Sequence, residues 1–323
     1  MNMLIYANMK SFNRIVLVCI IGTYLVIFAG AVVRGTGSGL GCPDWPRCFG
    51  QWIPPTDISE LPANYKEIYK IAGKTIADFD PFKTWTEYIN RLAGALLGFA
   101  IVIMFIKSFK HRTLEKNLPW YSGGLLFLVI IQGGVGALVV STHLKPFLIT
   151  IHMFLAIVLL FGLLYLRKYC NDLDDKSIIG KTDKKALKFS RILVWLTFLQ
   201  ILMGTQVRQQ VDHLTRDTQT TTYAEVINHL NSVFYIHRTF SFVIVGLFIW
   251  LIHYFYKRNY NRYALFMSCF AFVGVIGNIV SGIALNYFGF PISAQPPHLV
   301  FAILTIGTLY SLTLNLRGTL LED

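Results

Sequence analysis

Eight long apolar segments dominate this chain of 323 residues and restrict what it can fold into. Each is about 20 residues long, the length an α-helix needs to cross the hydrocarbon core of a bilayer. They lie at about 15–33, 88–106, 120–140, 148–166, 192–207, 236–256, 263–285 and 298–316. The fifth segment is short and could extend towards Gln210. Because a spanning segment must satisfy its backbone hydrogen bonds internally, the sequence predicts an all-α membrane protein with eight transmembrane helices.

The charged residues predict how these helices cross the membrane. Only 14% of the chain is charged, yet the net charge is +12, which raises the question of nucleic-acid binding. With the N-terminus inside, 18 of the 29 Lys and Arg residues fall in inside segments, as the positive-inside rule requires. This distribution argues against a nucleic-acid partner. It predicts that both termini are cytoplasmic and that the loops 35–86, 141–147, 208–234 and 286–296 lie outside.

The N-terminal segment indicates the compartment. Its apolar run of about 19 residues is longer than a typical signal-peptide core, and no cleavage motif follows it. Residues 1–14 do not supply the Arg- and Ser-rich extension of a mitochondrial transit peptide. The expected location is a bacterial inner membrane, with the protein passing through it several times.

Polar residues at the starts of four apolar segments reveal an internal repeat. His237 follows Asn90 by 147 residues, and His298 follows His152 by 146. Gly282 likewise follows Gly136 by 146, where small residues let helices pack closely or leave room for a macrocycle. We therefore predict two pseudo-symmetric four-helix bundles. The expected N-terminal half is 1–170 with the long first outer loop 35–86, the linker is 171–190, and the C-terminal half is 191–323.

The second half carries a complete histidine pair, His237 and His298, at matched depth. Histidine is a common axial ligand of haem iron, and the cores of helix bundles often hold cofactors. The pair therefore suggests bis-histidine haem. A zinc site is the weaker alternative, because no third or fourth ligand accompanies the pair. In the first half, Asn90 stands where the partner of His152 is expected.

Four arginines stand at the outer ends of the repeated helices: Arg34, Arg91, Arg208 and Arg238. An arginine at such a place is costly unless it is paired, and these have few acidic residues nearby in sequence. The propionates of two haems would provide partners, because guanidinium binds carboxylate bidentately. Snorkelling of each side chain to the membrane interface is the alternative.

One acidic residue has no counterpart in the second half. Glu87 precedes Asn90 by three residues and Arg91 by four, so the three share one helix face, whereas the equivalent residue is Phe234. An acid confined to the incomplete half is what a catalytic site needs. The alternative is an ion pair between Glu87 and Arg91.

The first outer loop contains two cysteines, Cys42 and Cys48, separated by a proline-containing segment. In an oxidising compartment this spacing favours a disulfide, either structural or redox-active. The glycine-rich stretch 34–41 before it indicates close approach of the backbone to a flat ligand or to a neighbouring helix. A short helix is expected around 60–77.

Several of these motifs together resemble those of the haem A synthases, over nearly the whole chain. They are Arg34–Pro46, Glu87-Tyr88, Asn90-Arg91, Gln132-Gly133-Gly134 with Gly136, Lys145-Pro146 before His152, and His237-Arg238. The resemblance implies an eight-helix bundle with haem b as cofactor in the C-terminal half and haem O as substrate in the N-terminal half. It implies oxidation of the 8-methyl group of haem O to a formyl group, which gives haem A for cytochrome oxidase.

The resemblance also implies roles for individual residues. The essential acid corresponds to Glu87, and the redox cysteine pair to Cys42 and Cys48. His237 and His298 would bind the iron of haem b. Haem O, haem A and the bilayer are the expected partners. Haem O synthase, cytochrome oxidase subunit I and a second copy of the chain are further expected ones.

Asn90 departs from the pattern of that family, which has histidine there. Asparagine is a poor ligand of haem iron, so the substrate iron would be bound by His152 alone, or water or His143 would take the sixth position. An intact Glu87 and Arg91 argue against an inactive enzyme. A dihaem b-type electron-transfer protein that oxidises quinol, or a haem transporter or chaperone, are the alternative functions.

Overall fold

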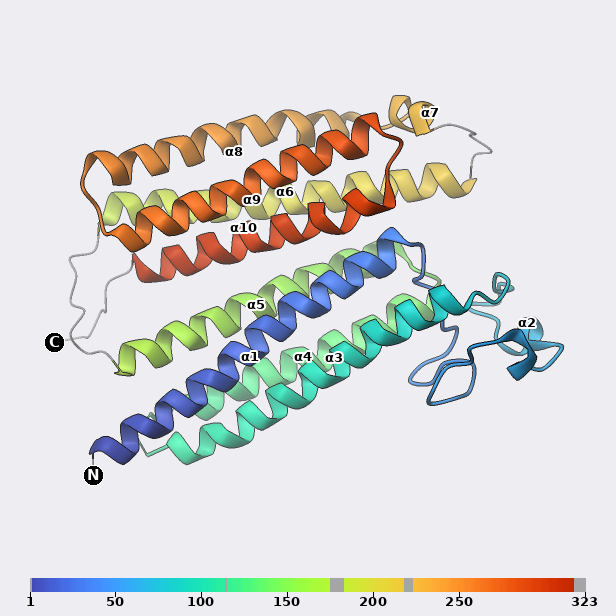
Figure 1. The fold of residues 1–323 in the computed structure, drawn as a ribbon, viewed down its shortest axis with the longest axis horizontal. Coiled ribbons are helices and arrows are strands. Elements are labelled where there is room, and N and C mark those ends of the chain that lie inside the picture. Colours follow the sequence, from blue (N-terminus) through green and yellow to red (C-terminus); the bar gives the residue numbers. More distant parts are fainter. Residues whose placement is uncertain (1, 114, 175–182, 218–222, 317–323) are drawn as a thin grey trace. The chain divides into compact units, whose positions relative to one another are not determined.

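The chain folds almost entirely into helices in a computed structural model, which describes residues 2–113, 115–174, 183–217 and 223–316. In these ranges the only β-structure is two isolated bridges in the loop after the first helix. The helices are α1 (Asn2–Gly35), η1 (Ile58–Glu60), α2 (Tyr65–Ile68), α3 (Pro81–Ser108), η2 (Phe109–His111), α4 (Leu118–Ser141), α5 (Pro146–Asp174), α6 (Lys184–Asp217), α7 (Tyr223–Asn228), α8 (Ser232–Lys257), α9 (Arg262–Tyr287), η3 (Ile292–Ala294) and α10 (Gln295–Asn315) (Figure 1).

Eight of these helices are long and apolar enough to span a membrane, as far as the described residues extend. They are α1, α3, α4, α5, α6, α8, α9 and α10. Seven of the predicted apolar runs lie inside them, and the eighth, 298–316, ends one residue beyond α10. The predicted all-α class with eight spanning helices is thus confirmed. The predicted placement of both termini in the cytoplasm stays a prediction.

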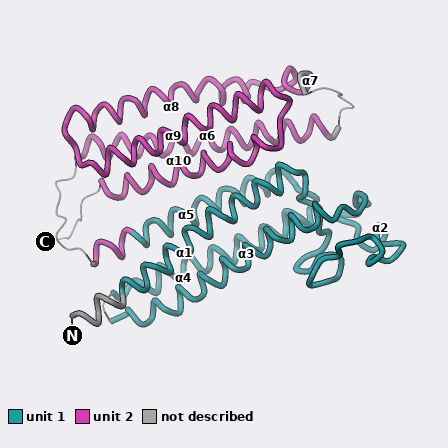
Figure 2. The backbone as a smooth tube through the Cα atoms, viewed as in Figure 1, with its two compact units in different colours: residues 1–167 teal, residues 168–323 magenta. Residues whose placement is uncertain are grey.

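The chain divides into two compact units, residues 1–167 and residues 168–323 (Figure 2). This division falls near the predicted end of the N-terminal half at residue 170. The predicted linker 171–190 is helical at both ends, because α5 continues to Asp174 and α6 begins at Lys184. Residues 175–182 of that linker lie outside the described residues.

The first unit is built from α1, α3, α4 and most of α5. A glycine on α1 lets it approach α3, since a Cβ at Gly22 would lie 3.2 Å from the Leu97 side chain. Gly162 on α5 lies closer still to α4, and a Cβ there would be 2.5 Å from Leu125. Helix α3 begins with Asp80 as its N-cap, whose side chain accepts a hydrogen bond from the Lys83 backbone N–H.

The second unit is built from α6, α8, α9 and α10, with the tightest contact between the last two. A Cβ at Gly274 would lie 2.4 Å from Thr305 Oγ1, and one at Gly277 would lie 2.8 Å from Phe301. Small residues at a helix interface allow such close approach of two backbones. This contact fixes α10, the helix that carries His298, against α9.

The loop between α1 and α3 forms a small lobe at one end of the first unit. Its core is aromatic: Phe49 contacts Tyr65, Tyr69 and Phe79 edge-to-face. The predicted helix around 60–77 is wrong in extent. Only Tyr65–Ile68 is α-helical, preceded by the 3₁₀ turn η1, because the aromatic contacts and turns hold the rest of the loop in irregular backbone.

Candidate functional site

The two histidines of the C-terminal half face each other inside the second unit. His237 on α8 and His298 on α10 have ring centroids 6.4 Å apart and ring planes 72° apart. Two metal–imidazole bonds of about 2 Å place the bound nitrogens about 4 Å apart, with each ring centroid roughly 1 Å further back. The observed spacing therefore fits one iron atom between the rings. The described residues contain no group of three or more His, Cys, Asp or Glu arranged to hold a metal ion, so a closed zinc site has no support.

Hydrogen bonds define which nitrogen of His298 can bind a metal. Its Nδ1 lies 3.0 Å from the Asn278 carbonyl oxygen and 3.0 Å from Ser281 Oγ. A carbonyl oxygen only accepts, so Nδ1 carries the proton and donates it. The lone pair of this imidazole is then on Nε2, the nitrogen available to iron.

A glycine of a neighbouring helix lies against every side chain at the four repeated positions. A Cβ built on that glycine would lie 3.7 Å from Asn90 Oδ1 at Gly30, 3.2 Å from His152 Cε1 at Gly136, 3.2 Å from His237 Cε1 at Gly204, and 3.4 Å from His298 Cε1 at Gly282. Two of these glycines, Gly136 and Gly282, were expected to serve close packing or to leave room for a macrocycle. In the structure they make room for the ligand side chains themselves. Asn90 occupies the same kind of place as the three histidines.

A glutamine supports two of the histidines from the glycine-bearing helix. Gln132 Nε2 donates to the His152 carbonyl oxygen at 3.0 Å, and Gln200 Nε2 donates to the His237 carbonyl oxygen at 2.8 Å. Each glutamine precedes its glycine by four residues, one helical turn. The residue one turn before Gly30 is valine, so the Asn90 position lacks this support. Sequence analysis missed Gln200, although its spacing from Gly204 was a usable signal.

The N-terminal half, which the resemblance assigns to the substrate haem, has its polar groups arranged differently from the C-terminal half. His152 Nδ1 and Asn90 Oδ1 are both buried without a hydrogen-bond partner among the described residues. Gln132 Nε2 lies 3.5 Å from His152 Nε2. His143, the alternative ligand, lies in the turn between α4 and α5 with a positive φ of 58°. The fit to a haem iron in this half thus rests on His152.

Glu87 is buried at the start of α3 and faces the disulfide loop. The backbone N–H of Cys42 donates to Glu87 Oε2 at 3.0 Å. Arg91 donates from Nε and Nη2 to Glu87 Oε1, at 3.1 and 2.5 Å. The ion pair between Glu87 and Arg91, which was the alternative to a catalytic role for Glu87, is present.

Arg91 uses the remainder of its guanidinium to hold the same loop. Nη1 donates to the carbonyl oxygens of Asp44 and Arg47, and Nη2 donates to that of Cys42, at 2.5, 3.0 and 2.8 Å. With the two bonds to Glu87, all five guanidinium N–H groups are engaged. In this conformation Arg91 has no donor for a haem propionate, so the expected propionate contact is not supported at this residue.

The other three arginines have different surroundings. Arg208 pairs with Asp212 at 2.9 Å and donates to Gln295 Oε1 at 2.6 Å, so the expectation of few acidic partners is wrong for it as for Arg91. Arg238 is exposed, and its guanidinium lies over the rings of two aromatic residues of α8. Arg34 is half-buried near the end of α1. A propionate role at these three positions stays a prediction.

The disulfide loop is joined to α3 by a close backbone contact. Cys42 and Cys48 form a disulfide with Cα atoms 4.8 Å apart. A Cβ at Gly41 would lie 2.4 Å from the Lys83 carbonyl oxygen, and Thr84 Oγ1 donates to the Gly41 carbonyl oxygen at 2.9 Å. The glycine-rich stretch 34–41 was expected to approach either a flat ligand or a neighbouring helix. Gly41 contacts the neighbouring helix, α3.

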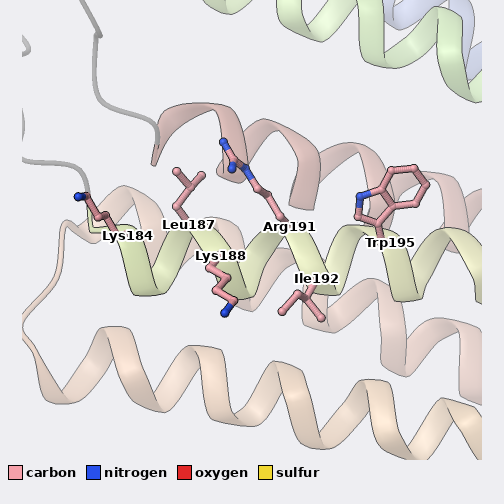
Figure 3. A pocket seen from close by; sticks show the side chains of 6 residues that line it. All are labelled: Lys184, Leu187, Lys188, Arg191, Ile192 and Trp195. Atoms are coloured by element: carbon pink, nitrogen blue, oxygen red, sulfur yellow. The ribbon is translucent and has the colours of Figure 1, made fainter.

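A hollow on the surface of the second unit is remote from the histidine pair. It has a volume of about 320 Å³ and lies along the first turns of α6 (Figure 3). Its lining residues are Lys184, Leu187, Lys188, Arg191, Ile192 and Trp195. Gly204, which contacts His237, lies nine residues further along the same helix. This hollow therefore takes no part in the histidine site.

Replacing Gly204 by alanine is expected to weaken haem binding in the second unit. The new methyl group would lie 3.2 Å from His237 Cε1 and would push the ring off its rotamer. Such a displacement costs about 0.5–1.5 kcal/mol, roughly a two- to tenfold loss of affinity. The measurement is the haem-to-protein ratio during haem titration. Gly246→Ala is the matched control, since a Cβ there meets nothing within 4 Å; equal affinities of the two variants would contradict the prediction.

Comparisons with known proteins agree with the resemblance in the motifs. A family described as Cytochrome oxidase assembly protein matches residues 13–310. A Heme A synthase of Shewanella oneidensis is 32% identical over 152 residues, which are 46% of this chain and 43% of that protein. One of Nitrosospira multiformis is 27% identical over 200 residues, 58% of this chain and 56% of that protein. The chain thus spans about half the length of these two relatives. A Heme A synthase of Shouchella clausii is 25% identical over 325 residues, with 97% of this chain and 95% of that protein covered.

Proposed function

Because the chain belongs to the family described as Cytochrome oxidase assembly protein, we propose that it oxidises haem O to haem A. The relatives named Heme A synthase support this activity. The observation that carries the proposal is the difference between the halves: one has two facing histidines, and the other has His152 and, at the remaining repeated position, Asn90.

In this proposal the C-terminal half holds haem b as a resident cofactor. His237 and His298 would bind its iron through their Nε2 atoms, and the 6.4 Å between the ring centroids supports this. Haem b bound there would supply one-electron transfer. Arg208, towards the C-terminal end of α6, and Arg238, near the N-terminal end of α8, would bind its propionates.

The N-terminal half would hold the substrate. His152 would bind the iron of haem O, with Asn90 opposite and Arg34 at the propionates. Conversion of a methyl to a formyl group removes two hydrogens and adds one oxygen, a four-electron oxidation. Two successive hydroxylations at one carbon, followed by loss of water, give this result. An open position on the iron is compatible with oxidation, because an oxidant must reach it.

Glu87 is the acid that the reaction would require in this half. Its contacts suggest how it serves: it joins α3 to the disulfide loop at the end of the bundle where α5 begins. Arg91 belongs to the same arrangement rather than to the propionates. Cys42, whose backbone N–H donates to Glu87, and its disulfide partner Cys48 would exchange electrons with the substrate site when their disulfide is reduced.

Two alternatives explain less. A dihaem electron carrier needs two complete ligand pairs, and Asn90 leaves one pair incomplete. A haem transporter or chaperone has no need of a buried acid confined to one half. We further propose a multi-pass protein of a bacterial inner membrane with its haem sites towards the outer side. Haem O synthase, cytochrome oxidase subunit I and a second copy of this chain are its candidate protein partners.

The decisive experiment supplies the full chain with haem O in a host that lacks its own enzyme for haem A. Haems are then extracted and their masses determined. The proposal expects haem A, or its hydroxylated precursor, in cells with the wild-type chain and only haem O with an empty vector. Identical haem profiles in the two would refute the activity.

A further inference from the structure

We infer that Ser281 and the Asn278 carbonyl make the C-terminal haem resident, and that the absence of an equivalent in the N-terminal half makes its haem exchangeable. This inference rests on the proposed function, because it assumes that His298 and His152 bind haem iron. It adds a positioning role for Ser281 that the ligand assignment alone does not contain.

Ser281 and Asn278 hold the His298 ring by the nitrogen that faces away from the metal. The Nδ1 proton is shared between the Asn278 carbonyl oxygen and Ser281 Oγ, both at 3.0 Å. Ser281 Oγ in turn donates to the Gly277 carbonyl oxygen at 2.7 Å. The hydroxyl therefore accepts from the imidazole while its own proton is engaged elsewhere, which fixes both the tautomer and the angle of the ring.

The first half has no counterpart of the Ser281 hydroxyl. The 146-residue repeat aligns Ser281 with Val135 and Asn278 with Gln132. A valine side chain offers no hydrogen-bonding atom. The Gln132 backbone carbonyl could accept a hydrogen bond as the Asn278 carbonyl does, but in the described residues it is not a partner of His152 Nδ1. His152 Nδ1 is buried without a hydrogen-bond partner in the described part of the chain, and so is Nδ1 of His237, the other proposed ligand of the resident haem. Among these three histidines only His298 has its outer nitrogen held.

This difference changes how firmly an iron is held. A partner on the outer nitrogen of a ligating histidine orients the ring and raises its basicity, and its loss typically costs about 10–100-fold in metal affinity. A more basic imidazole also stabilises the oxidised iron and lowers the reduction potential. A cofactor that stays through many cycles needs the firm ligand. A substrate that must leave as product needs the weaker one.

The test measures haem b on the purified full chain, without turnover of haem O. Ser281→Val copies the first half, Ser281→Ala removes the hydroxyl without adding volume, and Ser281→Thr retains it. The readouts are the reduction potential of the low-spin haem and its rate of transfer to a haem-free globin. Because the Asn278 carbonyl oxygen still accepts from Nδ1 in both variants, we expect Ser281→Val and Ser281→Ala to raise the potential and to speed transfer by the lower end of that range, about tenfold. Ser281→Thr should stay near the wild type.

The reciprocal variant, Val135→Ser, should slow the release of haem from the N-terminal half. Unchanged potential and transfer rate in Ser281→Ala would overturn the inference, and this variant serves if Ser281→Val does not fold. A wild-type chain that binds no low-spin haem would overturn both the inference and the proposed function. A chain that shows these shifts in haem b yet makes no haem A would leave the inference standing and refute only the activity.

Discussion

His298→Ala is expected to abolish the low-spin haem spectrum of the purified protein. Removal of one imidazole leaves His237 as a single ligand, and a haem iron with one strong axial ligand is no longer low-spin. The Asn278 carbonyl and Ser281 Oγ would also lose the group they hold. Visible absorption of the reduced protein and electron paramagnetic resonance of the oxidised protein both report this change. His237→Ala should have the same effect, because the two ring centroids lie 6.4 Å apart, a spacing that fits one iron atom bound by both.

His152→Ala is the matched control for this prediction. It removes an equivalent histidine from the other unit, so the low-spin signal of the C-terminal haem should remain while haem O binding is lost. The proposal would be wrong about which half holds the resident haem if the low-spin spectrum survived His298→Ala, or if it disappeared only in His152→Ala.

Glu87→Ala is expected to destabilise the N-terminal unit and to stop haem A formation. The change leaves the Arg91 guanidinium without its anion and the Cys42 N–H without its acceptor, at a place where Glu87 is 4% and Arg91 14% exposed. Removing one partner of a buried ion pair costs about 3–5 kcal/mol. Thermal unfolding of the purified protein measures the loss, and extraction of haems measures the activity.

Controls separate the loop contact from a direct chemical role. Glu67→Ala removes an exposed acid from the same loop and should change neither quantity. In the double variant Glu87→Ala, Arg91→Ala no guanidinium remains unpaired, so it should unfold less readily than the sum of the two single variants predicts. If Glu87→Ala unfolds like the wild type and still makes haem A, the buried pair contributes neither to the stability of the unit nor to haem A formation.

Much of the fold followed from patterns that the sequence displays directly. Apolar runs of spanning length located all eight long helices, because burial in lipid imposes the same requirement along a whole segment. Helix ends were less predictable. Helix α6 continues to Asp217, far beyond its apolar run 192–207, because polar residues can extend a helix once it is started.

The site was predictable where its residues recur and unpredictable where backbone atoms do the binding. The 146- and 147-residue spacings identify the histidines from the sequence alone. The Arg208–Asp212 pair was missed although its four-residue spacing was a visible signal. The grip of Arg91 on the loop had no such signal, because three of its acceptors are backbone carbonyl oxygens, which every residue carries.

The hydrogen bonds from Arg91 to the loop affect which side chains the loop can carry. Between Cys42 and Arg47, the hydrogen bonds that Arg91 donates all go to main-chain carbonyl oxygens. Trp45, 55% exposed, projects from the held segment into its surroundings. The main chain thus secures the anchorage, so the exposed side chain of Trp45 can be exchanged without loosening it. The Asp44 carboxylate is excluded from this freedom, because it accepts hydrogen bonds from the Phe49 and Gly50 backbone N–H groups.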